Sequence, residues 1–105
     1  MYGYLPLNLL SLIIGETIDC MAKYKNLKAR GITFVFKYDE IAPELLHIYA
    51  RHTTFPKDAI TAFFSAEPKW NDENQRFETY SDTHVIYWYW IKKDSVVMII
   101  TCVSL

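Results

Sequence analysis

The chain has 105 residues, of which 51% are hydrophobic, 16% aromatic and 22% charged. This length suits a single domain with its own core, and the apolar share excludes a disordered tail. The formal net charge of −1 excludes binding of a polyanion through bulk positive charge, so any contact with nucleic acid needs a local basic patch.

The N-terminal region shows no targeting or anchoring pattern. Residues 1–7 carry no positive side chain, and the apolar run over residues 9–14 is too short to span a bilayer. We therefore expect no membrane association. The two cysteines, Cys20 and Cys102, lack metal-ligand spacing and are interpreted as reduced core residues, which favours a cytoplasmic protein.

The first expected element is a helix over residues 8–30. Asn8 suits an N-cap and Gly31 a stop, and four cations crowd the last turns, where they complement the helix dipole. A solvated helix face and a nucleic-acid contact are both open interpretations of these cations. The chain is thus expected to be one domain, with a helical element over residues 1–31 and an α+β core over residues 32–105.

A strand and two short helices are expected next. Residues 32–37 alternate as a strand does. Pro43 fits the first turn of a helix that runs from Glu44 to about His52, and Pro56 fits the first turn of another that ends before Pro68.

The last third of the chain predicts a polar loop and three strands. Residues 69–75 are polar, and residues 76–80, 83–91 and 96–103 are rich in β-branched and aromatic side chains. The predicted fold class is therefore α+β: an N-terminal helix, a strand, two short helices and a three-stranded antiparallel meander, in a sheet of about four strands.

The final hairpin is apolar on both faces. Along residues 84–91, Val85, Tyr87, Tyr89 and Ile91 share one face, whereas His84, Ile86, Trp88 and Trp90 share the other. The same alternation places Val96, Met98, Ile100 and Cys102 on one face of the return strand. Both faces should therefore be covered, by helices or by another molecule.

No strong catalytic motif is present. The chain has no Gly-rich phosphate loop, no nucleophile elbow and no Cys or His pair at metal spacing, so neither a metal nor another cofactor is expected. His47 and His52 lie five residues apart, on different faces of the expected helix, which argues against a two-histidine metal site.

A scattered set of basic and imidazole side chains could perform phosphate chemistry. A metal-independent ribonuclease needs a base for the 2′-hydroxyl, an acid for the leaving 5′-oxygen and cations for the phosphorane. The catalytic candidates are Arg51, His52, Arg76 and His84, and the phosphate-binding candidates are Lys57 and Lys69. From spacing alone, ordinary surface cations are the simpler interpretation.

Several short motifs carry a family resemblance. They are Phe34-Val35-Phe36-Lys37-Tyr38-Asp39, Arg51-His52 before Phe55, Asp58-Ala59, Glu67-Pro68, Arg76-Phe77 and Ile99-Ile100-Thr101. From Phe34 to about Thr101 the chain resembles the small ribonuclease toxins of the BrnT type, relatives of the RelE group in bacterial toxin–antitoxin systems. The chain departs from this pattern at Thr53, where the family usually has Gly, and in lacking terminal basic residues.

The resemblance implies a toxin-like, metal-independent endoribonuclease with Arg51, His52, Arg76 and His84 as its active constellation. RNA would be its substrate, and a cognate antitoxin would cover the cleft.

An alternative hypothesis is a non-catalytic immunity or antitoxin-like protein that binds and blocks a basic toxin. The near-neutral charge and the acidic loop favour it, and its partner-binding residues would be Trp70, Asp72 and Glu73.

Overall fold

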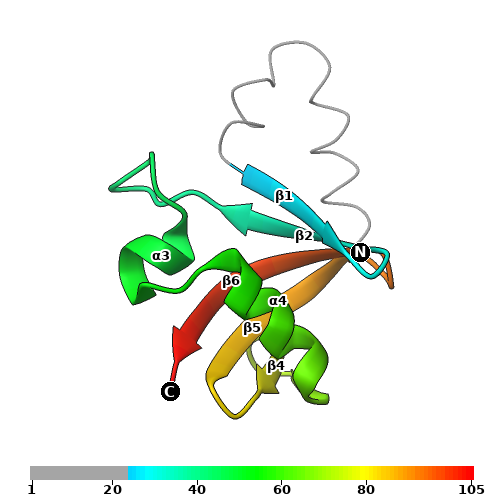
Figure 1. The fold of residues 1–105 in the computed structure, drawn as a ribbon. Coiled ribbons are helices and arrows are strands. Elements are labelled where there is room, and N and C mark those ends of the chain that lie inside the picture. Colours follow the sequence, from blue (N-terminus) through cyan, green and yellow to red (C-terminus); the bar gives the residue numbers. More distant parts are fainter. Residues whose placement is uncertain (1–23) are drawn as a thin grey trace.

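The computed structural model describes residues 24–105, which form a six-stranded mixed sheet and two short helices (Figure 1). In chain order the elements are β1 (Tyr24–Ala29), β2 (Ile32–Lys37), α3 (His47–His52), α4 (Pro56–Ser65), β3 (Pro68–Asn71), β4 (Arg76–Tyr80), β5 (His84–Lys92) and β6 (Val96–Ser104). The strands lie in the order β1-β2-β6-β5-β4-β3. Only β2 and β6 pair in parallel.

The connection from β2 to β3 determines this order. It carries α3 and α4 across one face of the sheet to the far edge, where β3 begins (Figure 1). Three antiparallel connections then return the chain through β4 and β5 to β6. Because β6 ends this return beside β2, two strands distant in sequence become parallel neighbours inside the sheet.

Both helices bury their apolar sides against the same sheet face. Ile48 of α3 and Ala59 and Ala62 of α4 are buried there. The sheet residues buried in this helix-side core are Phe34, Phe36, Ile86, Trp88, Val97, Ile99 and Cys102. Aromatic rings meet edge to face across the layer: the ring centroids of Phe34 and Phe63 are 5.0 Å apart, and those of Phe63 and Trp88 are 4.7 Å apart.

The predicted N-terminal helix is wrong wherever the structure tests it. Tyr24–Ala29 is the edge strand β1, and Arg30 and Gly31 form a two-residue turn with φ of 52° and 79°. Such a turn, with φ positive at both residues, matches the twist of a hairpin. Glycine adopts positive φ after a helix as readily as in a hairpin, so Gly31 alone could not distinguish a helix end from a hairpin turn. Cys20 and the rest of that prediction lie outside the described residues.

The predicted fold, with its N-terminal helix and a sheet of about four strands, is also wrong at the opposite edge. The expected polar loop over residues 69–75 begins as strand β3, in which Trp70 pairs with Phe77 of β4 at a ring distance of 4.9 Å. Strands β1 and β3 together extend the sheet to six strands, and the parallel pairing of β2 with β6 makes it mixed.

The final hairpin is confirmed, but a bulge changes the faces of its second strand. Tyr87 pairs with Thr101 whereas Trp88 pairs with Ile99, so Ile100 is an extra residue in β6. Alternation therefore breaks at Ile100. As a result, Cys102 shares the helix-side core with Val97 and Ile99, and not the face of Met98 as predicted.

The sheet face opposite the helices, which we call the open face, has a smaller apolar centre. Val35, Ile91 and Met98 are buried there, with Tyr24, Tyr89 and Val96 packed around them. Neither α3 nor α4 packs its apolar side on this face. In the described part of the chain, no helix is long and apolar enough to cross a membrane.

A substitution in the helix-side core tests this architecture directly. Phe34 is fully buried and contacts two phenylalanine rings of α4, so Phe34→Ala should lower the free energy of unfolding by about 3–5 kcal/mol, as truncation of a buried aromatic ring does. Ile41→Ala is the control, because Ile41 is 79% exposed and should change little. Urea unfolding followed by tryptophan fluorescence measures both; equal losses in the two variants would contradict this packing.

Candidate functional site

A pocket of about 500 Å³ opens where β2 ends, between α3 and the open face. Two of its walls come from segments distant in sequence. The loop after β2 and helix α3 contribute Tyr38, Asp39, Glu40, His47 and Arg51, and the strands contribute Tyr24, Lys37, Tyr89, Met98, Ile99 and Ile100. The pocket thus combines charged groups from α3 and its loop with tyrosines from the sheet.

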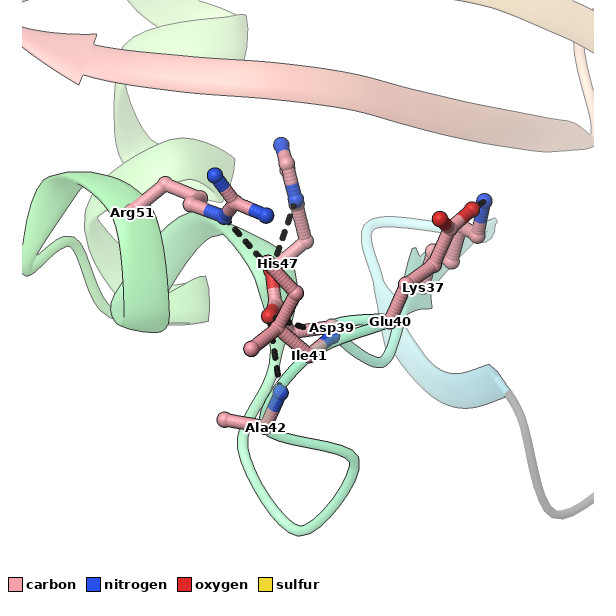
Figure 2. A network of polar contacts seen from close by, with 7 residues as sticks. All are labelled: Lys37, Asp39, Glu40, Ile41, Ala42, His47 and Arg51. Carbon is pink, nitrogen blue, oxygen red and sulfur yellow. Dashed lines mark hydrogen bonds and ion pairs between the residues drawn. The ribbon is translucent and has the colours of Figure 1, made fainter.

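Asp39 is the central polar residue of this pocket, and it is only 4% exposed. Its carboxylate accepts four hydrogen bonds (Figure 2): from the backbone N–H groups of Ile41 and Ala42, both at 3.0 Å, from Arg51 Nε at 2.9 Å and from His47 Nδ1 at 3.2 Å. The N–H of Ala42 is the largest influence on the pKa of Asp39, followed by Arg51, and together the donors hold that pKa well below its usual value. Asp39 is therefore ionised at neutral pH.

The local sequence explains how these groups meet. An aspartate readily accepts hydrogen bonds from backbone N–H groups two or three residues ahead, and this closes the loop that follows β2. The bridge between Tyr38 and Leu46 then returns the chain to the start of α3. His47 and Arg51 are four residues apart on α3, so they share one face of the helix and both reach Asp39.

This arrangement orients both basic side chains. An ionised carboxylate can only accept, so the hydrogen bond places the proton of His47 on Nδ1 and leaves Nε2 of the neutral ring as the acceptor. In Figure 2 the second ring nitrogen points away from Asp39. Arg51 uses Nε for Asp39, and its terminal Nη groups have no hydrogen bond to another side chain within residues 24–105. The pocket therefore offers a proton acceptor beside a guanidinium group.

The structure does not bring the four predicted catalytic residues together. Arg51 lines the pocket, and the ring of His52 lies 6.1 Å from that of His47 but outside the lining. Arg76 lies on β4 in an ion pair with Glu78, and His84 begins β5, where its Nδ1 contacts the Thr83 hydroxyl at 2.8 Å. Only Arg51 of the predicted constellation lines the pocket.

The remaining predicted residues lie on other surfaces. Lys57 is in the first turn of α4, and Lys69 is on β3 with its ammonium 5.9 Å from the Tyr80 ring. Trp70 is 42% exposed and donates from Nε1 to Asp72 Oδ1 at 3.3 Å. Asp72 also accepts hydrogen bonds from Gln75, so its polar atoms serve the turn between β3 and β4. Glu73 is exposed in the same turn.

Sequence reasoning missed His47 and Asp39 as site residues. The readable signal was the four-residue spacing of His47 and Arg51, which indicates one helix face. The role of Asp39 could not be read from spacing, because its eight- and twelve-residue separations depend on the path of the loop.

We also looked for metal-binding groups in the described residues and for similarity to known proteins. Within residues 24–105, no group of three or more His, Cys, Asp and Glu side chains could hold a metal ion. Neither a family model, nor a curated protein, nor a solved structure matches this chain. The candidate function must therefore be argued from the pocket itself.

The role of Asp39 predicts a pH dependence. Because its pKa is lowered in the folded state, Asp39 should contribute stability that is fully present above its unfolded-state pKa of about 4 and is lost as the pH falls below that value. Asp39→Asn should therefore be less stable than the unmodified protein at pH 7, and the difference should shrink between pH 5 and pH 3.

Urea midpoints of the two proteins at pH 7, 5, 4 and 3 measure this difference. A difference that stays constant down to pH 3 would contradict the hydrogen-bonding pattern of Asp39. Glu40→Gln is the matched control, because Glu40 is an exposed neighbour whose carboxylate forms a surface ion pair with Lys37.

Proposed function

We propose that the chain is a metal-independent endoribonuclease, similar to the small ribonuclease toxins of toxin–antitoxin systems. One observation carries this proposal: a buried, ionised Asp39 holds an imidazole and a guanidinium at the wall of one pocket. Cleavage of RNA without a metal needs a proton acceptor and a cation beside the same phosphate, and His47 and Arg51 supply both.

The reaction follows from these two groups. Nε2 of His47 accepts the proton of a ribose 2′-hydroxyl, and the 2′-oxygen forms a bond to the adjacent phosphorus as the bond from phosphorus to the 5′-oxygen breaks. The leaving 5′-oxygen takes a proton from water, because the pocket opens to solvent, and the proton on His47 neutralises the hydroxide that this leaves, which restores the base. The products are a 2′,3′-cyclic phosphate and a 5′-hydroxyl. The Nη groups of Arg51 stabilise the charge on the phosphorane oxygens.

This proposal keeps the predicted reaction class and changes its residues. Arg51 remains, His47 takes the proton-transfer role expected of His52 or His84, and Asp39 orients both groups. A neutralising partner would act by covering the pocket. The alternative of a non-catalytic blocking protein has less support, because Asp72 is engaged within its own turn.

The proposal predicts RNA cleavage that persists in EDTA. His47→Gln should lower the cleavage rate by about 100-fold or more, the usual contribution of a general base, and Arg51→Lys should also lower it because lysine lacks the planar donors. Cleavage of a fluorescent single-stranded RNA, with end groups identified by mass spectrometry, measures both effects.

His84→Gln is the matched control, because it removes an imidazole that lies outside the pocket. It should cleave within about twofold of the unmodified protein. The proposal fails if the unmodified protein leaves RNA intact, or if His84→Gln loses as much activity as His47→Gln.

A further inference from the structure

We propose that single-stranded RNA lies across the open face, with one of its bases stacked on a platform made by Arg76 and Tyr87. The choice of RNA as ligand rests on the proposed function. The platform itself is outside the catalytic pocket, and it gives Arg76 a binding role in place of the predicted catalytic one.

The guanidinium of Arg76 is fixed as a flat surface. Its Cζ lies 3.7 Å from the centroid of the Tyr87 ring, which is van der Waals contact. Arg76 Nε donates a hydrogen bond to Glu78 Oε2 at 3.0 Å, and Nη2 lies 3.0 Å from the same oxygen in the ion pair, so both contacts hold the guanidinium plane against the ring. Unstacked bases in protein–RNA complexes stack on arginine planes of this kind as well as on aromatic rings.

A second aromatic group lies beside the platform. Tyr80 is 48% exposed, and its hydroxyl donates to Glu78 Oε1 at 2.8 Å. This hydrogen bond, together with burial and the charge of Glu78, raises the pKa of Tyr80 to about 12. The ammonium of Lys69 lies over the same ring at 5.9 Å. Rings interleaved with cations are typical of surfaces that bind single strands.

The platform continues into the pocket through Tyr89. The antiparallel register that pairs Phe77 with Trp88 carries Arg76 to the position opposite Tyr89, which lines the pocket. Tyr87 and Tyr89 share the open face at a separation of about 7 Å, two residues along a strand. An RNA chain held at the pocket by Arg51 would therefore contact Tyr89 first and then the platform.

The charges between the pocket and the platform suit a polyanion, although the net charge of the whole chain is −1. The two least exposed acids there, Asp39 and Glu78, have their oxygens occupied by N–H and O–H donors. The cations that these acids hold, Arg51 and Arg76, keep 45% and 23% of their side chains exposed, and Lys69 is exposed as well. The exposed acid at the pocket, Glu40, is paired with Lys37. Charge complementarity therefore favours a nucleic acid over an apolar protein surface as the occupant.

Binding of an uncleavable oligonucleotide tests the platform separately from catalysis. The probe is a fluorescein-labelled 12-nucleotide RNA with 2′-O-methyl groups throughout, and fluorescence anisotropy at several salt concentrations gives its dissociation constant. Arg76→Lys keeps the charge and removes the plane, so it should weaken binding about tenfold with little change in the salt dependence. Tyr80→Leu removes an exposed ring and should weaken binding severalfold.

Lys93→Ala is the control for removal of an exposed cation away from the platform, and it should bind the probe nearly as tightly as the unmodified protein. Urea midpoints confirm that each variant is folded. The inference is overturned if the unmodified protein does not bind the probe, or if Arg76→Lys and Tyr80→Leu both bind it as tightly as Lys93→Ala does.

The two proposals fail in different ways. Probe binding that depends on Arg76 and Tyr80, without RNA cleavage by the unmodified protein, supports the platform and contradicts the nuclease. Cleavage that depends on His47, with unaltered probe binding by Arg76→Lys and Tyr80→Leu, supports the nuclease and contradicts the platform.

Discussion

The constraint on which the site depends is the burial of one carboxylate. A buried charge must be fully hydrogen-bonded, and Asp39 meets this requirement with two backbone N–H groups and two basic side chains. The backbone bonds shape the loop after β2, and the side-chain bonds orient His47 and Arg51 on α3. One residue therefore couples the end of the interior strand β2 to α3, the only helix that reaches the pocket in the described chain.

A second acid with little exposure, Glu78, holds a cation in the same way at the other side of the open face. Glu78 accepts from Asn71, Arg76 and Tyr80, and the hydrogen bond from Asn71 is the largest of the effects that lower the pKa of Glu78. In both places an acid with little exposure immobilises a cation that faces outward. A chain with a net charge of −1 can thus present basic groups along one path, because the matching negative charges lie beneath them.

Patterns confined to one strand were predictable, whereas pairings between strands were not. The alternation of Ile86 and Trp88 with Tyr87 and Tyr89 was confirmed because period 2 is local to β5. The bulge at Ile100 depends on the register against β5, and no residue of β6 signals it. Residues 24–29 were assigned to a helix because Gly31 suits a helix stop and cations crowd the residues before it. Their true partners, in β2, are related to them only through the turn at Gly31.

The candidate site shows the same division between local and long-range information. Arg51, predicted as a catalytic residue from its place at a helix end, lines the pocket. Choosing His47 over His52 requires knowing which helix face meets Asp39, and this follows from the loop that Asp39 itself closes. Arg76 was predicted as a catalytic residue, and the structure places it on β4, outside the pocket lining. Only the strand order places β4 across the open face from the pocket, with Tyr89 of β5 between them. This arrangement is what allows one RNA strand to reach both the proposed binding surface and the proposed catalytic pocket.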